Sequence, residues 1–281
     1  MTELSSFERL VARIGAAAPG SPASDTCATG FPSIDSVLGG GVRHGDLVVI
    51  GGAVGSGKSS LALAIALRMA AAGTSALFLT HEMSAERVLE RALAMEGRCR
   101  IDDLRSGTLN DASRAQVDSA AARLRDRAPQ IGVLGAGGVE GLAGTLRRIT
   151  DLRVAFVDPL QVLAVGARPQ EEDLATATRA LKRFAVELGV AVVATSHVRG
   201  AAGGRADPRP VLDDFGALGA IEQEADVILG LFREEMFHPD SGVDGATELR
   251  LLKNRNGNTG YVDLYFYKQW LRFEDMLDPG K

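Results

Sequence analysis

Short runs of apolar residues alternate along this chain with longer segments in which apolar residues recur every three or four positions. The short runs predict β-strands and the longer segments predict amphipathic helices. Some runs are apolar almost throughout, as in Val190 to Ala194, which is typical of parallel strands covered on both faces. We expect strands at 47–51, 76–80, 131–134, 153–158, 190–195 and 226–232, and helices at 59–72, 84–97, 111–127, 139–150 and 171–188. The alternation predicts an α/β fold with a mainly parallel central sheet.

The C-terminal part of the chain breaks this alternation. Two runs with strand patterning, 247–252 and 261–266, flank a turn that contains Asn256 and Gly257. An Asn-Gly pair between two such runs is a strong short-range signal for a hairpin. We therefore expect an antiparallel hairpin added at the edge of the parallel sheet.

The N-terminal segment has its own pattern. Apolar residues at helical spacing predict an amphipathic helix over residues 4–18, and a loose stretch rich in Pro, Gly and Ser follows at 19–24. This helix packs either on its own core or on a neighbouring subunit, and the pattern favours neither. We expect a helix and flexible linker over residues 1–28 and one α/β domain over residues 29–281.

Composition narrows the class of protein. The chain has 281 residues, 46% of them hydrophobic, and a formal net charge of -5, which argues against coating nucleic acid by bulk electrostatics. Any such contact must be local. The two cysteines, Cys27 and Cys99, lack the spacing of a disulfide framework or a zinc site. With no apolar segment long enough to span a bilayer, we expect a cytoplasmic protein without a membrane partner.

A glycine-rich segment separates the first predicted strand of the core from the helix after it. Glycines let backbone N–H groups curl around an anion, and the following helix directs the positive end of its dipole at the same place. In such a loop the lysine reaches the β- and γ-phosphates and the next hydroxyl holds Mg²⁺. The segment predicts binding of a nucleoside triphosphate, and the alternative is an ordinary glycine turn beside a surface lysine. Its residues are Gly52, Ala53, Val54, Gly55, Ser56, Gly57, Lys58, Ser59 and Ser60.

Two acidic residues follow predicted strands at the same edge of the sheet. Asp158 ends the strand at 153–158, where a carboxylate can complete the Mg²⁺ site. Glu82 follows the strand at 76–80, where it can orient or deprotonate an attacking water. Asp158 can instead cap the loop before Pro159, and Glu82 can instead be an acid at the start of a helix.

Three further residues suggest how hydrolysis is sensed and completed. His197 follows the strand at 190–195, where it can hydrogen-bond the γ-phosphate, although a histidine satisfied at a strand end fits nearly as well. Lys253 and Arg255 approach the predicted hairpin tip, from which they can reach the phosphates of a neighbouring copy. Alternatively, Lys253 and Arg255 are ordinary solvated charges at a turn.

Taken in order, these motifs resemble the C-terminal motor domain of DnaB-type replicative DNA helicases, a family of RecA-like P-loop ATPases. The resemblance extends from about residue 29 onward. The motifs at Ile221 to Asp226 and Lys253 to Gly257 are the most specific, because other RecA-like ATPases share the phosphate loop but lack that combination. The matching stretches are Thr29 to Phe31, the phosphate loop, Glu82 to Ser84 with Arg91 downstream, Val157 to Gln161, Ile221 to Asp226, and Lys253 to Gly257.

The resemblance implies a RecA-like ATPase domain over residues 29–281, with the helix at 4–18 similar to a linker helix. It implies ATP with Mg²⁺, a hexameric ring, single-stranded DNA in the central channel, 5′-to-3′ movement, and a loader or primase as possible partners. The family's N-terminal collar domain has no counterpart in the sequence. The implied roles are phosphate binding for Lys58, Mg²⁺ binding for Ser59 and Asp158, nucleotide binding for Arg91, catalytic base for Glu82, and fingers in trans for Lys253 and Arg255.

The chain also departs from the family pattern. His197 stands where the family usually has glutamine, and Pro159 where it often has tyrosine. In a loop that usually faces DNA with an Arg-Glu pair, the corresponding residues are Gly216 and Ala217. Strand contact there would come from backbone N–H groups around Gly216 and Gly219.

A second candidate DNA contact is the loop that contains Arg199, Arg205 and Arg209, whose alternative is a solvated surface loop. The leading interpretation is a ring-shaped DNA helicase or translocase driven by ATP. The second is a regulatory or assembly ATPase that switches a protein partner without unwinding, which the acidic charge and the altered loop favour. A nucleotide-binding scaffold without turnover is disfavoured, because the proposed catalytic residues occur together.

Overall fold

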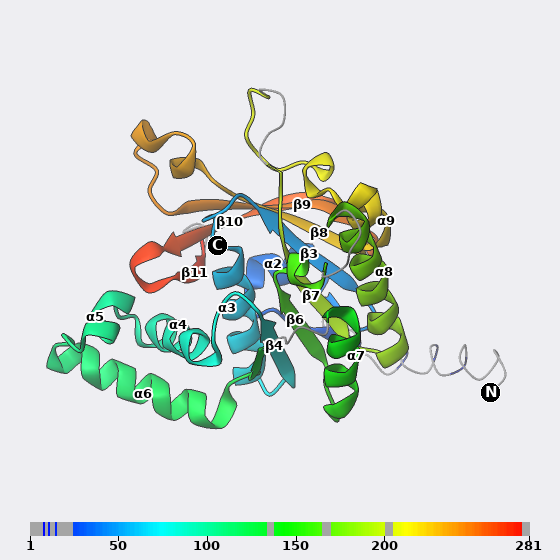
Figure 1. Cartoon of the computed structure of the whole chain (residues 1–281). Coiled ribbons are helices and arrows are strands. Elements are labelled where there is room, and N and C mark those ends of the chain that lie inside the picture. The colour runs from blue at the N-terminus through cyan, green and yellow to red at the C-terminus, as the bar shows by residue number, and fades with distance from the viewer. Residues whose placement is uncertain are drawn as a thin grey trace.

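The computed structural model describes residues 25–133, 138–164, 170–199 and 205–276, together with the isolated positions Glu8, Val11 and Gly15. Its central feature is a nine-stranded sheet in the order β11-β10-β9-β8-β3-β7-β6-β4-β5 (Figure 1). The six strands from β8 to β5 are parallel to one another, and β9, β10 and β11 are added by antiparallel pairing at the β8 edge. The predicted α/β fold with its added C-terminal hairpin is confirmed.

Every predicted strand is present, and its bounds agree closely with those of the apolar run that predicted it. The parallel strands are buried along nearly their whole length, except for β5. The strands of the main sheet are β3 (Leu47–Gly52), β4 (Ala76–Thr80), β5 (Gln130–Val133), β6 (Val154–Asp158), β7 (Ala191–His197), β8 (Val227–Arg233), β9 (Ala246–Asn254), β10 (Gly260–Tyr267) and β11 (Arg272–Asp275). A separate small sheet pairs β1 (Thr26–Cys27) with β2 (Val42–Arg43).

Helices cover both faces of the sheet (Figure 1). Alternate residues of β3 point to opposite faces of the sheet. Val48 and Ile50 pack with α3 and α4, whereas Leu47 and Val49 pack with α7 and α8. This two-sided cover explains why the strands are apolar throughout. The helices are α2 (Pro32–Val37), α3 (Lys58–Ala71), α4 (Ala85–Gly97), α5 (Ile101–Ser106), α6 (Asp111–Arg127), α7 (Gly138–Arg148), α8 (Gln170–Leu188) and α9 (Ala220–Glu224).

Several short elements were not predicted. Five- and six-residue helices such as α5 and α9 are too short to show a full helical period, and the sequence Arg-Phe-Glu-Asp of β11 carries little apolar signal. Short 3₁₀ turns complete the list of elements: η1 (Leu160–Leu163), η2 (Leu212–Phe215), η3 (Ala217–Gly219), η4 (Glu234–Met236), η5 (Pro239–Ser241) and η6 (Lys268–Trp270).

Two expectations concern the N-terminal part of the chain, most of which lies outside the described residues. The helix predicted at 4–18 lies outside the described residues except at three isolated positions. The division into residues 1–28 and 29–281 stays a prediction. Within the described ranges, none of the helices combines the length and the apolar character that crossing a membrane demands.

Candidate active site

The glycine-rich segment forms a tight turn between β3 and α3. Gly57 lies just before the helix with φ 103°, a conformation that favours glycine. A Cβ added to Gly57 would lie 2.9 Å from Cζ of Phe273, so the packing beneath the loop also demands glycine. Val54 and Gly55 at the tip are exposed, while Ser56 is buried. The helix that begins at Lys58 therefore directs its N-terminus into this loop, as a phosphate site requires.

Lys58 is buried and folded over its own loop. Its Nζ donates to the carbonyl oxygens of Gly52 at 3.0 Å and Ala53 at 2.9 Å. Burial lowers the pKa of Lys58, and the carboxylates of Asp158 and Glu82 oppose that shift. The ammonium is thus held within the loop by weak carbonyl partners, which a phosphate can replace with a stronger charged one.

The fit of a metal ion can be tested at Asp158, which is fully buried at the end of β6. Its Oδ1 accepts hydrogen bonds from Ser59 Oγ at 2.8 Å and Thr195 Oγ1 at 2.5 Å. Its Oδ2 is also buried and has no hydrogen-bond partner among the described residues. An unpartnered buried carboxylate oxygen beside a hydroxyl fits Mg²⁺, which binds through one or two carboxylates and oxygen ligands. Among the described residues, groups of three or more His, Cys, Asp or Glu side chains that could hold a metal are absent.

Glu82 and His197 lie beside each other at the same edge of the sheet. His197 Nε2 is 3.7 Å from Glu82 Oε1, and the two side chains are 42% and 46% exposed. Gln161 fixes the end of β7 through two hydrogen bonds. Its amide nitrogen donates to Ser196 Oγ, and its oxygen accepts from the backbone N–H of His197. Two predicted residues are therefore brought together, and both remain open to an incoming nucleotide.

Arg91 is placed near the same centre by α4. Burial holds the pKa of Arg91 below its ordinary value, although the charges of Asp158 and Glu82 oppose that shift. The Nε atom is buried and lacks a hydrogen-bond partner within the described part of the chain. Such a group is free to bind an anion, which agrees with the predicted role of Arg91 in nucleotide binding.

Arg233 is a site residue that the sequence reasoning missed. It ends β8 and donates from NH1 to the carbonyl of Gly55 in the phosphate loop at 3.2 Å. The guanidinium forms an ion pair with Glu235 and lies 4.7 Å from the ring centroid of Phe266. Only 4% of the side chain is exposed. A charged residue directly after the apolar run at 226–232 was the available signal, since buried charges mark functional or paired positions.

Lys253 and Arg255 point away from their own phosphate loop. Lys253 Nζ donates to the carbonyl of Glu222 at 2.6 Å, and Arg255 NH1 donates to Asp226 Oδ1 at 2.8 Å. Glu222 lies within α9, and Asp226 lies between the end of α9 and the start of β8. The two cations are therefore gathered at the edge of the sheet where the parallel strands start.

Strand register fixes how far this edge is from the phosphate loop. Gly52 pairs with Leu231, whereas Asn254 pairs with Val227, four residues earlier on β8. Four residues of strand span roughly 13 Å, and Arg255 lies beyond that. Lys253 and Arg255 are thus on the opposite edge from Lys58 of the same chain.

The arginines predicted to contact DNA are all paired with acids. Arg199 NH2 is 2.6 Å from Glu171, Arg205 binds both oxygens of Asp214, and Arg209 binds both oxygens of Glu248. These hydrogen bonds raise the pKa of Arg205 and Arg209 above the ordinary value. Their positive charges are offset locally, so the loop is less basic than its sequence suggests. The DNA-binding role of these residues stays a prediction.

The loop that contains Gly216 and Gly219 has an unusual backbone. Positive φ angles occur at four successive residues, Gly216, Ala217, Leu218 and Gly219, and two of these are not glycine. Such conformations are costly for residues with a Cβ and are found at functional sites. Ala217 is buried, which anchors the turn, while Leu218 is 66% exposed. The predicted backbone contact with DNA is not tested by this geometry.

Comparison with known proteins decides the family. The sequence model of the DnaB-like helicase C-terminal domain matches residues 26–275. The chain belongs to this family. It is 29% identical over 258 residues to replicative DNA helicase DnaB of Geobacillus stearothermophilus and 30% identical over 258 residues to that of Leifsonia xyli. These alignments cover 88% of this chain but 56% and 55% of the relatives, so the chain spans about half the length of the curated relatives it matches.

Solved structures show the same fold. One, described as a DnaB-like replicative helicase and its interactions with primase, has a TM-score of 0.87 at 23% identity and covers 99% of this chain and 67% of that chain. Another, the ATPase domain of G40P, has a TM-score of 0.88 at 22% identity and covers 98% of this chain and 99% of that chain. The RecA-like architecture expected from the motif order is confirmed.

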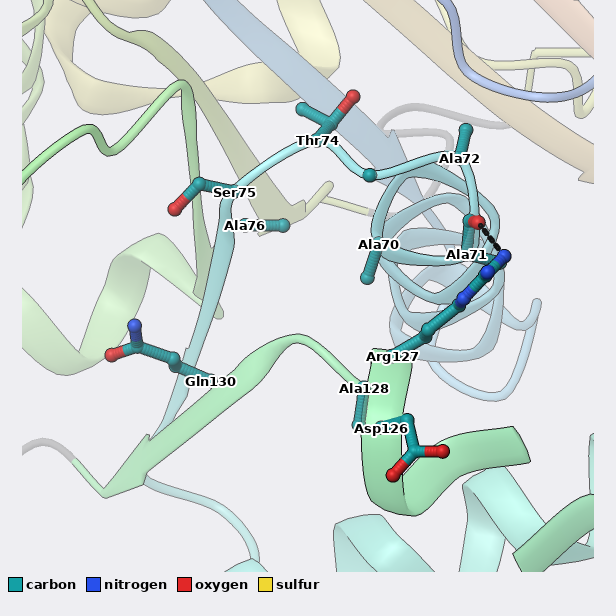
Figure 2. A pocket seen from close by; sticks show the side chains of 11 residues that line it. Ala70, Ala71, Ala72, Thr74, Ser75, Ala76, Asp126, Arg127, Ala128 and Gln130 are labelled. Atoms are coloured by element: carbon teal, nitrogen blue, oxygen red, sulfur yellow. Dashed lines mark hydrogen bonds between the residues drawn. The ribbon is translucent and has the colours of Figure 1, made fainter. Parts of the chain in front are cut away.

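A hollow of about 510 Å³ lies at the other end of α3, away from the phosphate loop (Figure 2). Its wall is formed by the end of α3 with the turn after it, by the end of α6 and by the starts of β4 and β5. Along one side, Arg127 donates to the carbonyl of Ala71 at 3.3 Å. None of the predicted site residues lines this hollow. The candidate active site is instead the open edge around Lys58, Asp158 and Glu82.

Proposed function

We propose that this chain is the motor part of an ATP-driven DNA helicase or translocase that hydrolyses ATP at the interfaces between copies of itself. The observation that carries this proposal is the position of Lys253 and Arg255 at the sheet edge opposite Lys58. Phosphoryl transfer requires a cation over the transition-state oxygens. Head-to-tail packing of identical copies would bring the fingers of one copy to the phosphate loop of the next, with a closed hexamer on single-stranded DNA as the expected assembly.

The residues divide the work as follows. Lys58 and the loop N–H groups bind the β- and γ-phosphates, and Arg91 adds a second cation beside them. Glu82 orients a water and accepts its proton, while His197 hydrogen-bonds the γ-phosphate and reports its presence through β7. Asp158 and the Ser59 hydroxyl would hold Mg²⁺, whose charge offsets the negative charge that develops on the phosphate oxygens.

The names of the similar proteins support this proposal. Matching proteins are named replicative DNA helicases, and one similar structure is described together with its primase interactions. By analogy, movement from 5′ to 3′ and contact with a loader or primase belong to the proposal for this chain. A cytoplasmic location belongs to it as well.

A second candidate function is favoured by the DNA-facing loops. The acid partners of Arg199, Arg205 and Arg209, with Gly216 and Ala217 at the altered positions, weaken the case for a basic channel. A regulatory or assembly ATPase that acts on a protein partner would not need such a channel. Dependence of hydrolysis on DNA separates the two functions.

The test is steady-state ATP hydrolysis with and without single-stranded DNA, at low and moderate salt. For the proposed motor we expect DNA to stimulate hydrolysis, and Glu82→Gln to abolish it while leaving nucleotide binding intact. Arg255→Ala is expected to lower the rate by about 10³-fold or more, as for other arginine fingers.

Mixing two inactive variants tests whether the site is shared. Lys58→Ala lacks the phosphate-loop lysine but keeps its fingers, whereas Arg255→Ala lacks a finger but keeps its loop. In random mixed assemblies about a quarter of interfaces combine an intact loop with an intact finger, so activity should return to about that share. Mixtures that stay inactive would contradict fingers in trans. Hydrolysis indifferent to DNA at both salts would favour the regulatory ATPase.

A further inference from the structure

The turn that carries the proposed finger Arg255 is held by the parallel strands and not by the β9–β10 hairpin itself. Pairing between β9 and β10 stops at Leu251 and Gly260. On its other side β9 continues along β8 as far as Asn254, which pairs with Val227. The end of β9 and the turn after it are therefore supported from the side of β8.

A change of register bends β9 just before the fingers. Lys253 faces Ile228 and Leu251 faces Leu229, so Leu252 is an extra residue on β9. Leu252 packs against the core beneath α7 and α8, which anchors this bulge. An extra residue of this kind bends and twists its strand and can redirect the side chains after it. The direction of both fingers therefore depends on what holds the strand end beyond the bulge.

Two hydrogen bonds fix the turn across the start of the sheet. The backbone N–H of Arg255 donates to the carbonyl of Asp226 at 2.7 Å, just before β8 begins. The side-chain amide of Asn256 donates to Asp46 Oδ2 at 2.5 Å, just before β3 begins. Because β8 lies between β9 and β3, the turn reaches over two strand spacings, roughly 10 Å. We call the contact between Asn256 and Asp46 the clasp.

Both residues of the clasp are themselves held in place. The backbone N–H of Asn256 donates to Oδ1 of Asn254 at 3.0 Å, which shapes the turn. Asp46 is partly buried, and its carbonyl accepts from the backbone N–H of Val192 at 2.9 Å. Burial raises the pKa of Asp46 above its ordinary value, although the hydrogen bond from Asn256 opposes that shift. The amide therefore offsets part of the cost of burying this carboxylate.

We propose that Asp46 and Asn256 are positioning residues that hold the finger Arg255 where it can reach the phosphates of a neighbouring copy. The side chain of Arg255 is 49% exposed and binds the carboxylate of Asp226 and the carbonyl of Gln223. Its backbone is thus fixed, while its guanidinium can exchange these contacts for a phosphate. A displacement of about 1 Å can lower a catalysed rate by about 10²-fold. This inference rests on the proposed function and adds to it the contact that sets the geometry of the shared site.

Steady-state kinetics of the full chain tests the clasp. Asn256→Ala removes the clasp and leaves Arg255 in place. Its kcat should fall by about 10- to 100-fold, less than in Arg255→Ala, while KM for ATP stays within about twofold. The urea midpoint should stay that of the parent, because Asn256 is exposed. Asn258 is exposed in the same turn and takes part through its backbone carbonyl, which accepts from Asn254. Asn258→Ala is therefore the matched control and should keep the parent's kcat.

Exchanging the two partners tests the contact itself. Asn256→Asp sets two carboxylates against each other and should lower kcat at least as far as Asn256→Ala does. Adding Asp46→Asn to that variant restores one amide and one carboxylate in reversed positions, with the net charge of the parent, so most of the lost rate should return. If Asn256→Ala proves unstable, this exchange still decides, because a double variant without recovery would contradict the proposal.

Mixed assemblies locate the defect. Asn256→Ala keeps its phosphate loop, and Lys58→Ala keeps its finger and its clasp. Their random mixture should therefore regain about a quarter of the parent's activity. A mixture of Asn256→Ala with Arg255→Ala should give no more than the mean of the two variants, because both are defective in the finger that they offer.

The outcomes separate this inference from the proposed function. A kcat equal to the parent's in Asn256→Ala would overturn the clasp. A low kcat that Lys58→Ala does not restore, in conditions where Lys58→Ala and Arg255→Ala restore each other, would also overturn it, since the defect would then lie at the variant's own phosphate loop. If Lys58→Ala and Arg255→Ala fail to restore each other, fingers in trans are wrong, and the clasp proposal falls with them.

Discussion

Asp226 is the residue whose loss should separate folding from catalysis most clearly. Its side chain is 4% exposed and holds three partners. Oδ2 accepts from the backbone N–H of Leu47 at 2.8 Å and from Lys182 Nζ at 2.6 Å, and Oδ1 accepts from Arg255 at 2.8 Å. One carboxylate therefore fixes the start of β3, a residue of α8 and a proposed finger.

The change Asp226→Ala leaves the N–H of Leu47 buried without its partner and the amine of Lys182 without its counter-charge. The unsatisfied N–H alone should cost about 1–3 kcal/mol, and together with the loss of the counter-charge of Lys182 the change should cost about 3–5 kcal/mol. Asp226→Asn keeps one acceptor oxygen and should cost less, about 1.5–3 kcal/mol. Arg255→Ala removes a side chain that is 49% exposed, so its cost should be at most about 1 kcal/mol.

Urea unfolding followed by circular dichroism measures these differences. With a slope of about 3 kcal/mol per molar urea, Asp226→Ala should lower the midpoint by on the order of 1 M. Arg255→Ala should keep the parent's midpoint while losing hydrolysis. An Asp226→Ala protein that unfolds within about 0.5 kcal/mol of the parent would refute the reasoning, because that is the scatter of ordinary surface substitutions.

Three further substitutions test the site and the packing beside it. Asp158→Asn should abolish Mg²⁺-dependent hydrolysis, and a titration that shows unchanged Mg²⁺ dependence of nucleotide binding would remove Asp158 from the metal site. Gly57→Ala should destabilise the fold by about 1–3 kcal/mol and weaken nucleotide binding, since φ is 103° and the new Cβ meets Phe273. The loss of stability in Gly57→Ala can be measured by thermal unfolding, and an unchanged Tm would contradict the predicted backbone strain and clash. Burial raises the pKa of Glu274, but hydrogen bonds from Arg272 and Arg68 outweigh it and hold the pKa below the ordinary value of 4.5. The stability that these bonds contribute is present above pH 4.5 and is lost as the pH falls through the lowered pKa. Glu274→Gln should therefore lower stability at pH 7 more than at pH 3, and equal losses at both would contradict the assignment.

Much of the architecture could be predicted because the signals are local. The parallel strands are apolar on both faces, and the phosphate loop needs a fixed spacing of glycines, lysine and serine between a strand and a helix. The meeting of Asp158 with Ser59, and of Glu82 with His197, followed from one rule, that parallel strands end at a common edge.

The remainder depended on pairings that sequence does not encode locally. Nothing in the runs around Arg205 and Arg209 shows that Asp214 and Glu248 would reach them, so the loop appeared more basic than it is. Arg233 was missed because Gly55, whose carbonyl accepts from its guanidinium, becomes its neighbour only when β8 pairs with β3. Edge strand β11 lacks an apolar pattern and is defined by pairing with β10.

If Lys253 and Arg255 act in trans as proposed, their separation from Lys58 along the length of the parallel strands has a consequence for stoichiometry. An isolated copy would contain a phosphate loop and a pair of fingers, but no complete site. An open row of copies would have one complete site at each interface, which is one fewer than its number of copies. Only closure makes the two numbers equal. Specific activity per chain should therefore rise with protein concentration and level off when the rows have closed, so that the enzyme's own abundance would act as its switch.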